Sequence, residues 1–131
     1  MGGTTAGTIP EEFYNASRLR DVDLLDMNLI GTISSRVMGL QGLHRFRVRG
    51  NNFTGEIPVE FASIAVLELA WFHLNDFSGS MPAEICRMRN DQFLTQLDTD
   101  CSPDDGIPAF GCDCCTVCCV RKTAVCTKTY D

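Results

Sequence analysis

The residues with the most reactive chemistry in this 131-residue chain are its eight cysteines, and seven of them lie after position 100. They are Cys86, Cys101, Cys112, Cys114, Cys115, Cys118, Cys119 and Cys126. An even number allows four disulfides, with roughly a hundred pairings that the sequence does not resolve. Thiolates are also good zinc ligands, and Cys115 and Cys118 have the spacing of half a zinc site. The cysteines therefore predict either a disulfide-stapled end or a metal site.

Disulfides account for this pattern better than a metal ion does. A four-thiolate zinc site usually takes two well-separated pairs, which the adjacent cysteines at 114–115 and 118–119 do not supply. The two histidines, His44 and His73, lie far from the cluster in the sequence. A Cys-x-x-Cys redox motif would need a βαβ context, and none surrounds it. We predict four disulfides, no metal ion and no cofactor; a metal-binding protein of the cell interior is the less favoured alternative.

A second set of residues, at alternate positions along the chain, has the chemistry of a binding surface. These residues are Asp21, Asp23, Arg45, Arg47, Arg49, Trp71 and His73. Alternate residues of a strand point to the same face of a sheet. Trp and Arg are enriched among residues that carry binding energy, because a guanidinium can hold a carboxylate while a ring stacks on an apolar surface. The set would suit a carboxylate-bearing peptide or a sugar.

A repeat of constant length predicts the elements that position these residues. Glycines at 7, 31, 55 and 79 are each 24 residues apart, and six apolar columns keep the same step. Segments such as Leu43-x-x-Phe46-x-Val48 alternate apolar and variable positions, which is typical of a short strand with one buried face. One such unit cannot bury its own apolar face, so successive units must stack.

Asparagine follows two of these strands at the same position of the repeat. Asn51 and Asn75 occupy this column, and Met27 occupies it in the first coil. A buried amide there can satisfy backbone groups of its own coil and of the neighbouring coil. We therefore predict a structural ladder of Asn51 and Asn75 that is missing from the first coil.

The Gly-x-Ile-Pro corners and the 24-residue period resemble the plant-type leucine-rich repeats from about Gly7 to Leu97. The resemblance implies an α/β-type solenoid, with short parallel strands on the concave face and irregular or 3-10 segments on the outer face. Repeats would start near 19, 43 and 67, with a partial one near 91, in a solenoid over residues 1–100. Residues 101–131 would form a cysteine-rich cap, where turn-forming residues predict loops without helix or strand.

Proteins with repeats of this type include receptor-kinase ectodomains and secreted polygalacturonase-inhibiting proteins, and the cysteine-rich end is similar to that of secreted algal leucine-rich repeat proteins. The resemblance implies a non-catalytic module that recognises a protein, peptide or carbohydrate through its concave face, outside the cell or at its surface. A scaffold subunit of a complex or of a cell-surface matrix is the alternative. The sequons at Asn15 and Asn52 agree with an exported, glycosylated chain.

Stacked parallel strands predict specific neighbours across the concave face. The expected ion pairs are Asp21 with Arg45 and Asp23 with Arg47. These pairs would leave Arg49 without a partner, beside an exposed Trp71. The alternative is that the pairs only neutralise each other, at about 0–1 kcal/mol each, and that Trp71 packs against Arg47.

Composition and motifs exclude several classes of function. The net charge of −6 repels phosphate backbones, so nucleic acid is not an expected partner. No apolar run reaches the roughly 20 residues of a membrane helix. No nucleophile motif or carboxylate pair accompanies the histidines, so we do not expect an enzyme. A 24-residue step back from the asparagine column reaches Gly3, so we expect the chain to begin inside a repeat, as a fragment without its N-terminal cap.

Overall fold

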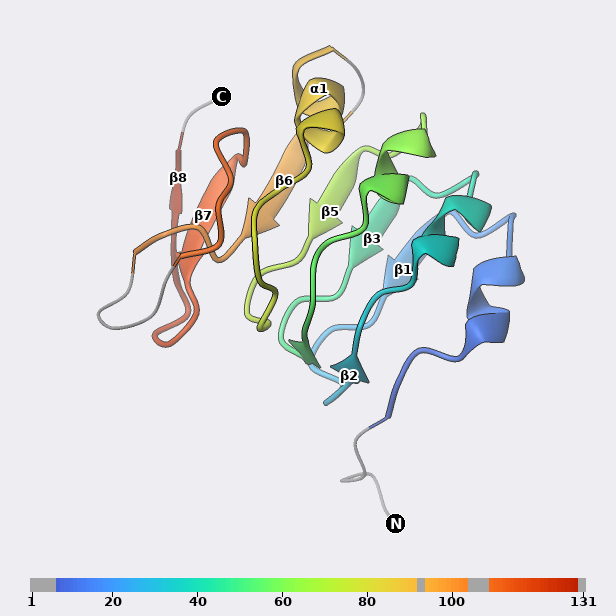
Figure 1. The fold of residues 1–131 in the computed structure, drawn as a ribbon, viewed down its shortest axis with the longest axis horizontal. Helices are drawn as coiled ribbons and strands as arrows, with labels where there is room; N and C mark the ends of the chain where they lie inside the picture. Colours follow the sequence, from blue (N-terminus) through green and yellow to red (C-terminus); the bar gives the residue numbers. More distant parts are fainter. Residues whose placement is uncertain (1–6, 92–93, 104–108, 130–131) are drawn as a thin grey trace.

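The computed structural model describes residues 7–91, 94–103 and 109–129, which form a curved stack of coils (Figure 1). Its main sheet has the strand order β1 (Asp21–Asp23), β3 (Arg45–Arg47), β5 (Leu69–Trp71), β6 (Gln96–Thr99), β7 (Val117–Val120) and β8 (Val125–Lys128). The first five strands are parallel, and β8 runs antiparallel to β7. A second parallel pair, β2 (Ile30–Gly31) and β4 (Asn52–Phe53), lies at a corner of the coils. The α/β-type leucine-rich repeat solenoid predicted by the sequence is confirmed.

The outer layer consists of one short helical segment in each of the first four coils. These segments are η1 (Glu11–Asn15), η2 (Ser35–Gly39), η3 (Val59–Ser63) and α1 (Ala83–Asp91). The first three are 3-10 helices of one to two turns, and they pack against one another in chain order. Ser34 begins η2 by accepting a hydrogen bond from the Arg36 backbone N–H at 3.0 Å. Proline precedes η1 and η3 instead, because its fixed φ suits the entry to a helix.

Strand register follows the repeat until the fourth coil. Asp21, Arg45 and Leu69 are partners in successive strands at steps of 24 residues, whereas Leu69 pairs with Gln96, a step of 27 (96 − 69). The partial repeat expected near 91 therefore has its strand at Gln96–Thr99. This longer coil contains the one α-helix of the described residues, in place of a 3-10 segment.

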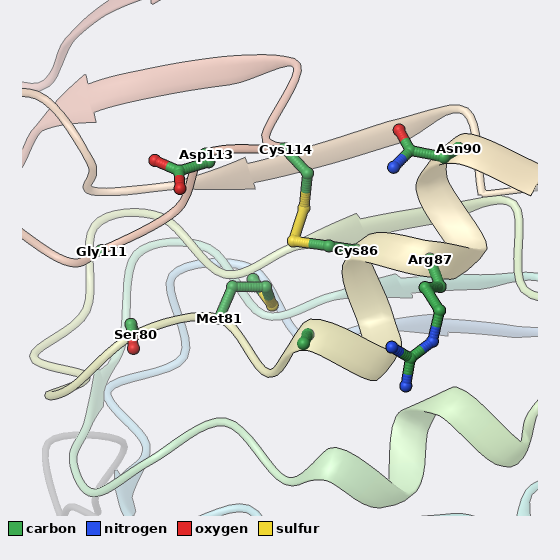
Figure 2. A pocket seen from close by; sticks show the side chains of 9 residues that line it. Ser80, Met81, Cys86, Arg87, Asn90, Gly111, Asp113 and Cys114 are labelled. Carbon is green, nitrogen blue, oxygen red and sulfur yellow. A yellow bond between two sulfur atoms is a disulfide. The ribbon is translucent and has the colours of Figure 1, made fainter.

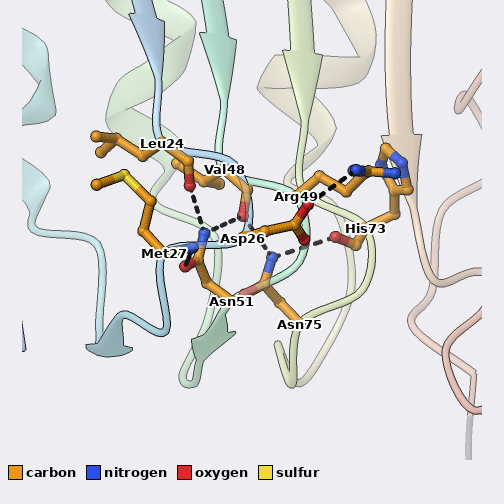
Figure 3. Close-up of polar contacts among 8 residues, drawn as sticks. All are labelled: Leu24, Asp26, Met27, Val48, Arg49, Asn51, His73 and Asn75. Carbon is orange, nitrogen blue, oxygen red and sulfur yellow. Dashed lines mark hydrogen bonds and ion pairs between the residues drawn. The ribbon is translucent and has the colours of Figure 1, made fainter. Parts of the chain in front are cut away.

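The asparagine column lies inside the solenoid and binds backbone groups of two coils (Figure 3). The Asn51 carbonyl accepts from the backbone N–H groups of Met27 and Leu29, both at 3.0 Å. Its amide donates to the carbonyl oxygens of Leu24 at 2.7 Å and Val48 at 2.9 Å. All four hydrogen-bonding positions of this buried side chain are thus filled.

Asn75 repeats this arrangement one coil further on. Its carbonyl accepts from the Phe53 N–H at 3.1 Å, and its amide donates to the carbonyl oxygens of Val48 and Phe72 at 3.0 and 3.1 Å. In the next coil a carboxylate has the corresponding role: Asp100 accepts from the backbone N–H groups of Leu74 at 2.9 Å and Asn75 at 3.2 Å.

The cysteine-rich end adds a fifth coil, so the expectation of loops without helix or strand is wrong. Strand β7 continues the parallel sheet beside β6, with Asp98 opposite Val117, a step of 19 residues (117 − 98). At the outer corner Gly111 pairs with Ser80, and its backbone N–H donates to the Gly79 carbonyl at 3.1 Å. The sheet then ends in the β7–β8 hairpin.

Four disulfides hold this fifth coil, and none of the eight cysteines is free. The pairs are Cys86–Cys114, Cys101–Cys118, Cys112–Cys115 and Cys119–Cys126. Cys115 and Cys118, which have the spacing of half a zinc site, belong to two different disulfides. The Cys86–Cys114 pair connects α1 to the fifth coil, and Cys119–Cys126 connects the two strands of the hairpin.

The apolar residues of the first coil are less buried than those of the coils that follow it. In the first coil Leu19, Leu24 and Leu29 are only partly buried, and Met27 is 55% exposed. Gly3, at the asparagine position expected before this coil, lies outside the described residues. None of the helices that the structure describes is both long and apolar enough to cross a membrane.

Candidate functional site

The concave face presents two columns of side chains because every second residue of each strand points away from the core. One column contains Asp21, Arg45, Leu69 and Gln96, and the other contains Asp23, Arg47, Trp71, Asp98 and Val117. The residues between them, such as Val22 and Phe46, are buried. Strand register thus brings together residues that are about 24 positions apart in the sequence.

In the first column, the predicted ion pair between Asp21 and Arg45 is present, with 3.1 Å between the Arg45 guanidinium and the carboxylate. Arg45 also lies 3.6 Å from the Glu68 carboxylate. The three side chains are each more than 40% exposed, so water screens these pairs and each contributes about 0–1 kcal/mol.

In the second column, Arg47 contacts an aromatic ring and not a carboxylate. Asp23 is its register partner, yet no ion pair joins the two, and both are described residues. The Arg47 guanidinium instead lies over the Trp71 ring, 5.3 Å from its centroid. The predicted ion pair is therefore wrong, and the alternative packing of Trp71 against Arg47 is present. The ring provides a large apolar surface for the flat guanidinium, whereas an exposed ion pair is worth little.

Arg49, which was expected to lack a partner, is paired with Asp26 at 3.1 Å (Figure 3). Asp26 lies in the turn after β1 and has a positive φ of 51°. A β-carbon at Gly50 would overlap the Asp26 carboxylate, so only glycine leaves room for this side chain. Strand alternation alone could not predict this pair, because the turn sets the position of Asp26.

Two aromatic residues of this face are less exposed than the alternation predicts. Trp71 is half-buried, and His73 is only 7% exposed. Their rings pack edge to face, with centroids 5.9 Å apart. Burial lowers the pKa of His73 to about 4, and the nearby positive charge of Arg49 adds to this shift. His73 is thus a neutral, buried ring near neutral pH and not part of the exposed surface.

Three ring or guanidinium nitrogens at this end of the face are buried without a hydrogen-bond partner among the described residues. They are Arg49 Nε, Trp71 Nε1 and His73 Nδ1; a fourth such atom, Arg89 Nε, belongs to α1. An unsatisfied buried group costs about 1–3 kcal/mol. Buried polar groups in proteins are almost always hydrogen-bonded, so this concentration of unpaired nitrogens marks a region whose polar contacts are incomplete.

Two carboxylates beside this region were not singled out from the sequence. Asp98 is the neighbour of Trp71 in the sheet, and burial raises its pKa to about 6, although a hydrogen bond from the Thr116 hydroxyl opposes the shift. Burial also raises the pKa of Asp100, against hydrogen bonds from the Leu74 and Asn75 backbone. The signal available in the sequence was the Asp98-x-Asp100 alternation, at the positions that Trp71 and His73 occupy one coil earlier.

The outer face contains a cavity of about 550 Å³ between α1 and the fifth coil (Figure 2). The disulfide Cys86–Cys114 crosses it, Arg87 and Asn90 line it from α1, and Asp113 lines it from the other wall. The sequence did not indicate this cavity, because its two walls are joined by a disulfide between residues that are 28 positions apart in the sequence.

Both predicted glycosylation residues are exposed. Asn15 ends η1, and its side-chain oxygen accepts from the Arg36 guanidinium at 2.7 Å. Asn52 begins β4, and its amide donates to the Asn28 side chain at 3.3 Å. Neither side chain is buried in the core, so modification at these residues stays a prediction.

The parallel sheet, the outer 3-10 segments and the repeating corners define a plant-type leucine-rich repeat protein with a cysteine-rich C-terminal region. No family model matches the chain. Receptor-like protein 31 of Arabidopsis thaliana is 31% identical over 87 residues, which are 64% of this chain and 10% of that protein. The chain spans about a tenth of the length of the curated relatives it matches.

Solved plant structures have the same fold. A chain of the BIR3–SERK2 complex from Arabidopsis thaliana has a TM-score of 0.66 and 27% identity, over 82% of this chain and 62% of that one. A chain in the structure of the Arabidopsis receptor kinase HAESA with the peptide hormone IDA and the co-receptor SERK1 has a TM-score of 0.65 and 26% identity, over 94% of this chain and 22% of that one.

Proposed function

We propose that this chain is a non-catalytic recognition module that binds an acidic peptide segment on its concave face, through Arg47 and Trp71. The observation that carries the proposal is the Arg47 guanidinium, which lies 5.3 Å from the centre of the Trp71 ring and has no ion pair among the described residues. A cation held in place by a ring loses little entropy when it binds a carboxylate.

The other two arginines of the same strand region are less available. Arg45 lies between two carboxylates and Arg49 is paired with Asp26. Of these three arginines, Arg47 is the one whose guanidinium has no carboxylate partner among the described residues and can bind an acidic ligand. Trp71, which is half-buried beneath it, extends the contact with apolar surface.

The comparisons support a protein or peptide as the partner. One similar structure is that of a receptor kinase in complex with a peptide hormone and a co-receptor. The curated relatives are called receptor-like proteins. Four disulfides support a location outside the cell or at its surface, because disulfides persist in oxidising compartments.

Paired synthetic peptides test this proposal. A library of extended peptides, each made once with Glu and once with Gln, is screened for binding by isothermal titration calorimetry, with wall-type glycans as a separate arm. We expect binding to the Glu peptides alone. Arg47→Ala should weaken it at least about tenfold, as a lost charged hydrogen bond implies, and Trp71→Ala should weaken it as well.

Arg36→Ala is the matched control, because Arg36 lies on the outer face and has the same charge. Its binding should equal that of the wild type. Equal binding of Glu and Gln peptides, or unchanged binding by Arg47→Ala, would show that this face does not recognise acidic peptides. Binding of glycans alone would assign the surface to carbohydrate.

A further inference from the structure

We propose that His73, Cys119 and Cys126 form a redox-gated zinc site: a thiol reductant that opens the Cys119–Cys126 disulfide creates two thiolates which, with the His73 imidazole, bind one Zn²⁺. This proposal goes beyond recognition by the concave face and does not depend on it. It concerns the end of the sheet where His73, in the turn after β5, approaches the β7–β8 hairpin.

The three side chains already surround one point. Their ligand atoms, the two sulfurs and a ring nitrogen, all lie within 4.8 Å of one another. No other group of three such side chains was found in the part of the chain that the structure describes. The two cysteines follow His73 by 46 and 53 positions in the sequence (119 − 73 and 126 − 73), so it is the fold that brings the three residues together.

His73 supplies the observation that points to a ligand. The residue is only 7% exposed, and its Nδ1 has no hydrogen-bond partner among the described residues. A buried imidazole usually donates or accepts at each nitrogen. The ring therefore has an unpartnered nitrogen and also lies within ligand distance of two sulfurs, as a metal-binding imidazole does.

The hairpin keeps the two sulfurs opposite each other after reduction. Cys119 and Cys126 are direct cross-strand partners, in a ladder of four residue pairs. A second disulfide, Cys101–Cys118, anchors β7 to the turn after β6, and the Ser102 backbone N–H donates to the Cys119 carbonyl at 3.1 Å. Opening of one disulfide therefore leaves the strand register in place.

Exposure makes this disulfide accessible to a reductant. Cys126 lies on β8, whose four residues are all exposed, whereas Cys119 is fully buried. A dithiol can attack the exposed sulfur, so that the S–S bond breaks and both protein sulfurs leave as thiols while the dithiol is oxidised to its own disulfide. Two electrons and two protons pass from the reductant to the protein.

Zinc binding then follows ordinary coordination chemistry. Zn²⁺ displaces the two thiol protons and takes two thiolates and one neutral imidazole, which leaves the fourth tetrahedral position for water on the side of Cys126. The metal replaces the lost S–S bond as the link between β7 and β8. Exchange with an oxidised dithiol reverses the step: the Cys119–Cys126 bond re-forms, the two electrons pass to that dithiol, which leaves as its thiol form, and Zn²⁺ is released.

Cobalt and zinc titrations of the oxidised and the reduced protein test the site. The protein is treated with graded dithiol, and alkylation with peptide mapping identifies the open cysteines. We expect reduced wild type to bind one Co²⁺ with the visible bands of a tetrahedral thiolate site, and Zn²⁺ to displace it. Zn²⁺ should also protect Cys119 and Cys126 from alkylation. Oxidised protein should bind neither metal.

His73→Gln separates this site from metal binding by any pair of free thiols. It should weaken Zn²⁺ binding by at least roughly tenfold, because the loss of a residue that only hydrogen-bonds a metal ligand already lowers metal affinity by that factor. It should also abolish the selective protection of Cys119 and Cys126. His44→Gln is the matched control and should bind as the wild type does, because His44 lies near Gly42 in a different coil. Thermal unfolding of the oxidised variants verifies their folding.

Three results would overturn the proposal. They are the absence of tetrahedral Co²⁺ bands in reduced wild type, equal Zn²⁺ affinity of His73→Gln and wild type, and equal protection of all open cysteines. A hairpin that unfolds on reduction would show the same loss of selective protection, and it would likewise contradict a preformed site.

Discussion

The first four coils and the fifth coil have the same backbone path but are held together by different chemistry. In the repeats, apolar columns such as Val37, Phe61 and Ile85 stack inside the solenoid. In the fifth coil, half-cystines such as Cys115 and Cys119 take the buried positions. Both regions contribute strands to one continuous parallel sheet (Figure 1).

This difference shows how a solenoid can end. A repeat is stabilised by the next one, so the last coil has an apolar side without a partner. Here a shorter coil with few large apolar residues covers that side, and covalent links compensate for the apolar area it cannot bury. The hairpin strand β8 then runs antiparallel to β7, so the parallel pairing of the described residues ends at β7.

The largest effect is expected in the repeat core. Phe46 is fully buried, and its ring lies 5.1 Å from that of Phe61 and 6.0 Å from that of Phe72. Phe46→Ala should lower the free energy of unfolding by about 3–5 kcal/mol, because it leaves a cavity against two aromatic rings of the core. Urea unfolding measures this loss. Val59→Ala, at an exposed position of η3, should change little. A loss below about 1 kcal/mol at Phe46 would contradict the packing.

A somewhat smaller effect is expected from one cap disulfide. Removal of Cys101–Cys118 by a double Ala substitution should cost about 3 kcal/mol, given the sequence separation of 17. Hydrogen exchange should then show loss of protection over residues 109–129 while β1, β3 and β5 stay protected. The pair Cys112–Cys115 spans only 3 positions and should matter less, at about 2 kcal/mol. Equal loss of protection in all strands would show that cap and repeats unfold as one unit.

The boundary between the two regions should respond to pH through Asp98. Its pKa is raised to about 6 by burial, so the folded protein holds the proton that the unfolded chain releases near pH 4. Its contribution to stability is therefore full below about pH 4 and is lost as the pH rises to about 6. Asp98→Asn should be more stable than the wild type at pH 7, by on the order of 2–3 kcal/mol at about 1.4 kcal/mol per unit.

Urea unfolding between pH 4 and pH 7 checks this prediction. The pKa of His73, lowered to about 4, gives a slope of opposite sign in the same range, so the difference between wild type and variant isolates Asp98. A difference that does not depend on pH would mean that Asp98 titrates normally in the folded protein.

The smallest of the four effects concerns the asparagine ladder. Asn51→Ala removes four hydrogen bonds to the backbone of two coils and should cost about 1–3 kcal/mol. The neighbouring Asn52→Ala is a matched control, because Asn52 is exposed and binds only another side chain. Thermal unfolding of both variants measures the difference. An Asn51 variant as stable as the Asn52 variant would mean that water replaces the amide.

The sequence by itself determined the repeats and the strands of the first three coils. Each coil reuses the same local pattern, so Val22, Phe46 and Ala70 could be placed on the buried side from their spacing alone. The same register predicted the pair between Asp21 and Arg45, since both residues lie within regular strands. Periodicity carries this information because stacking must be the same in every coil.

Only the tertiary structure decided the contacts made by turns and by the cap. The partner of Arg49 depends on a turn with positive φ at Asp26, and the partner of Arg47 depends on a choice between an exposed carboxylate and a ring. Strand β7 has no repeat pattern and forms because the open edge of β6 pairs with it. The pairing of the cysteines, and the position of His73 beside two of them, follow from distances across coils that no local pattern encodes.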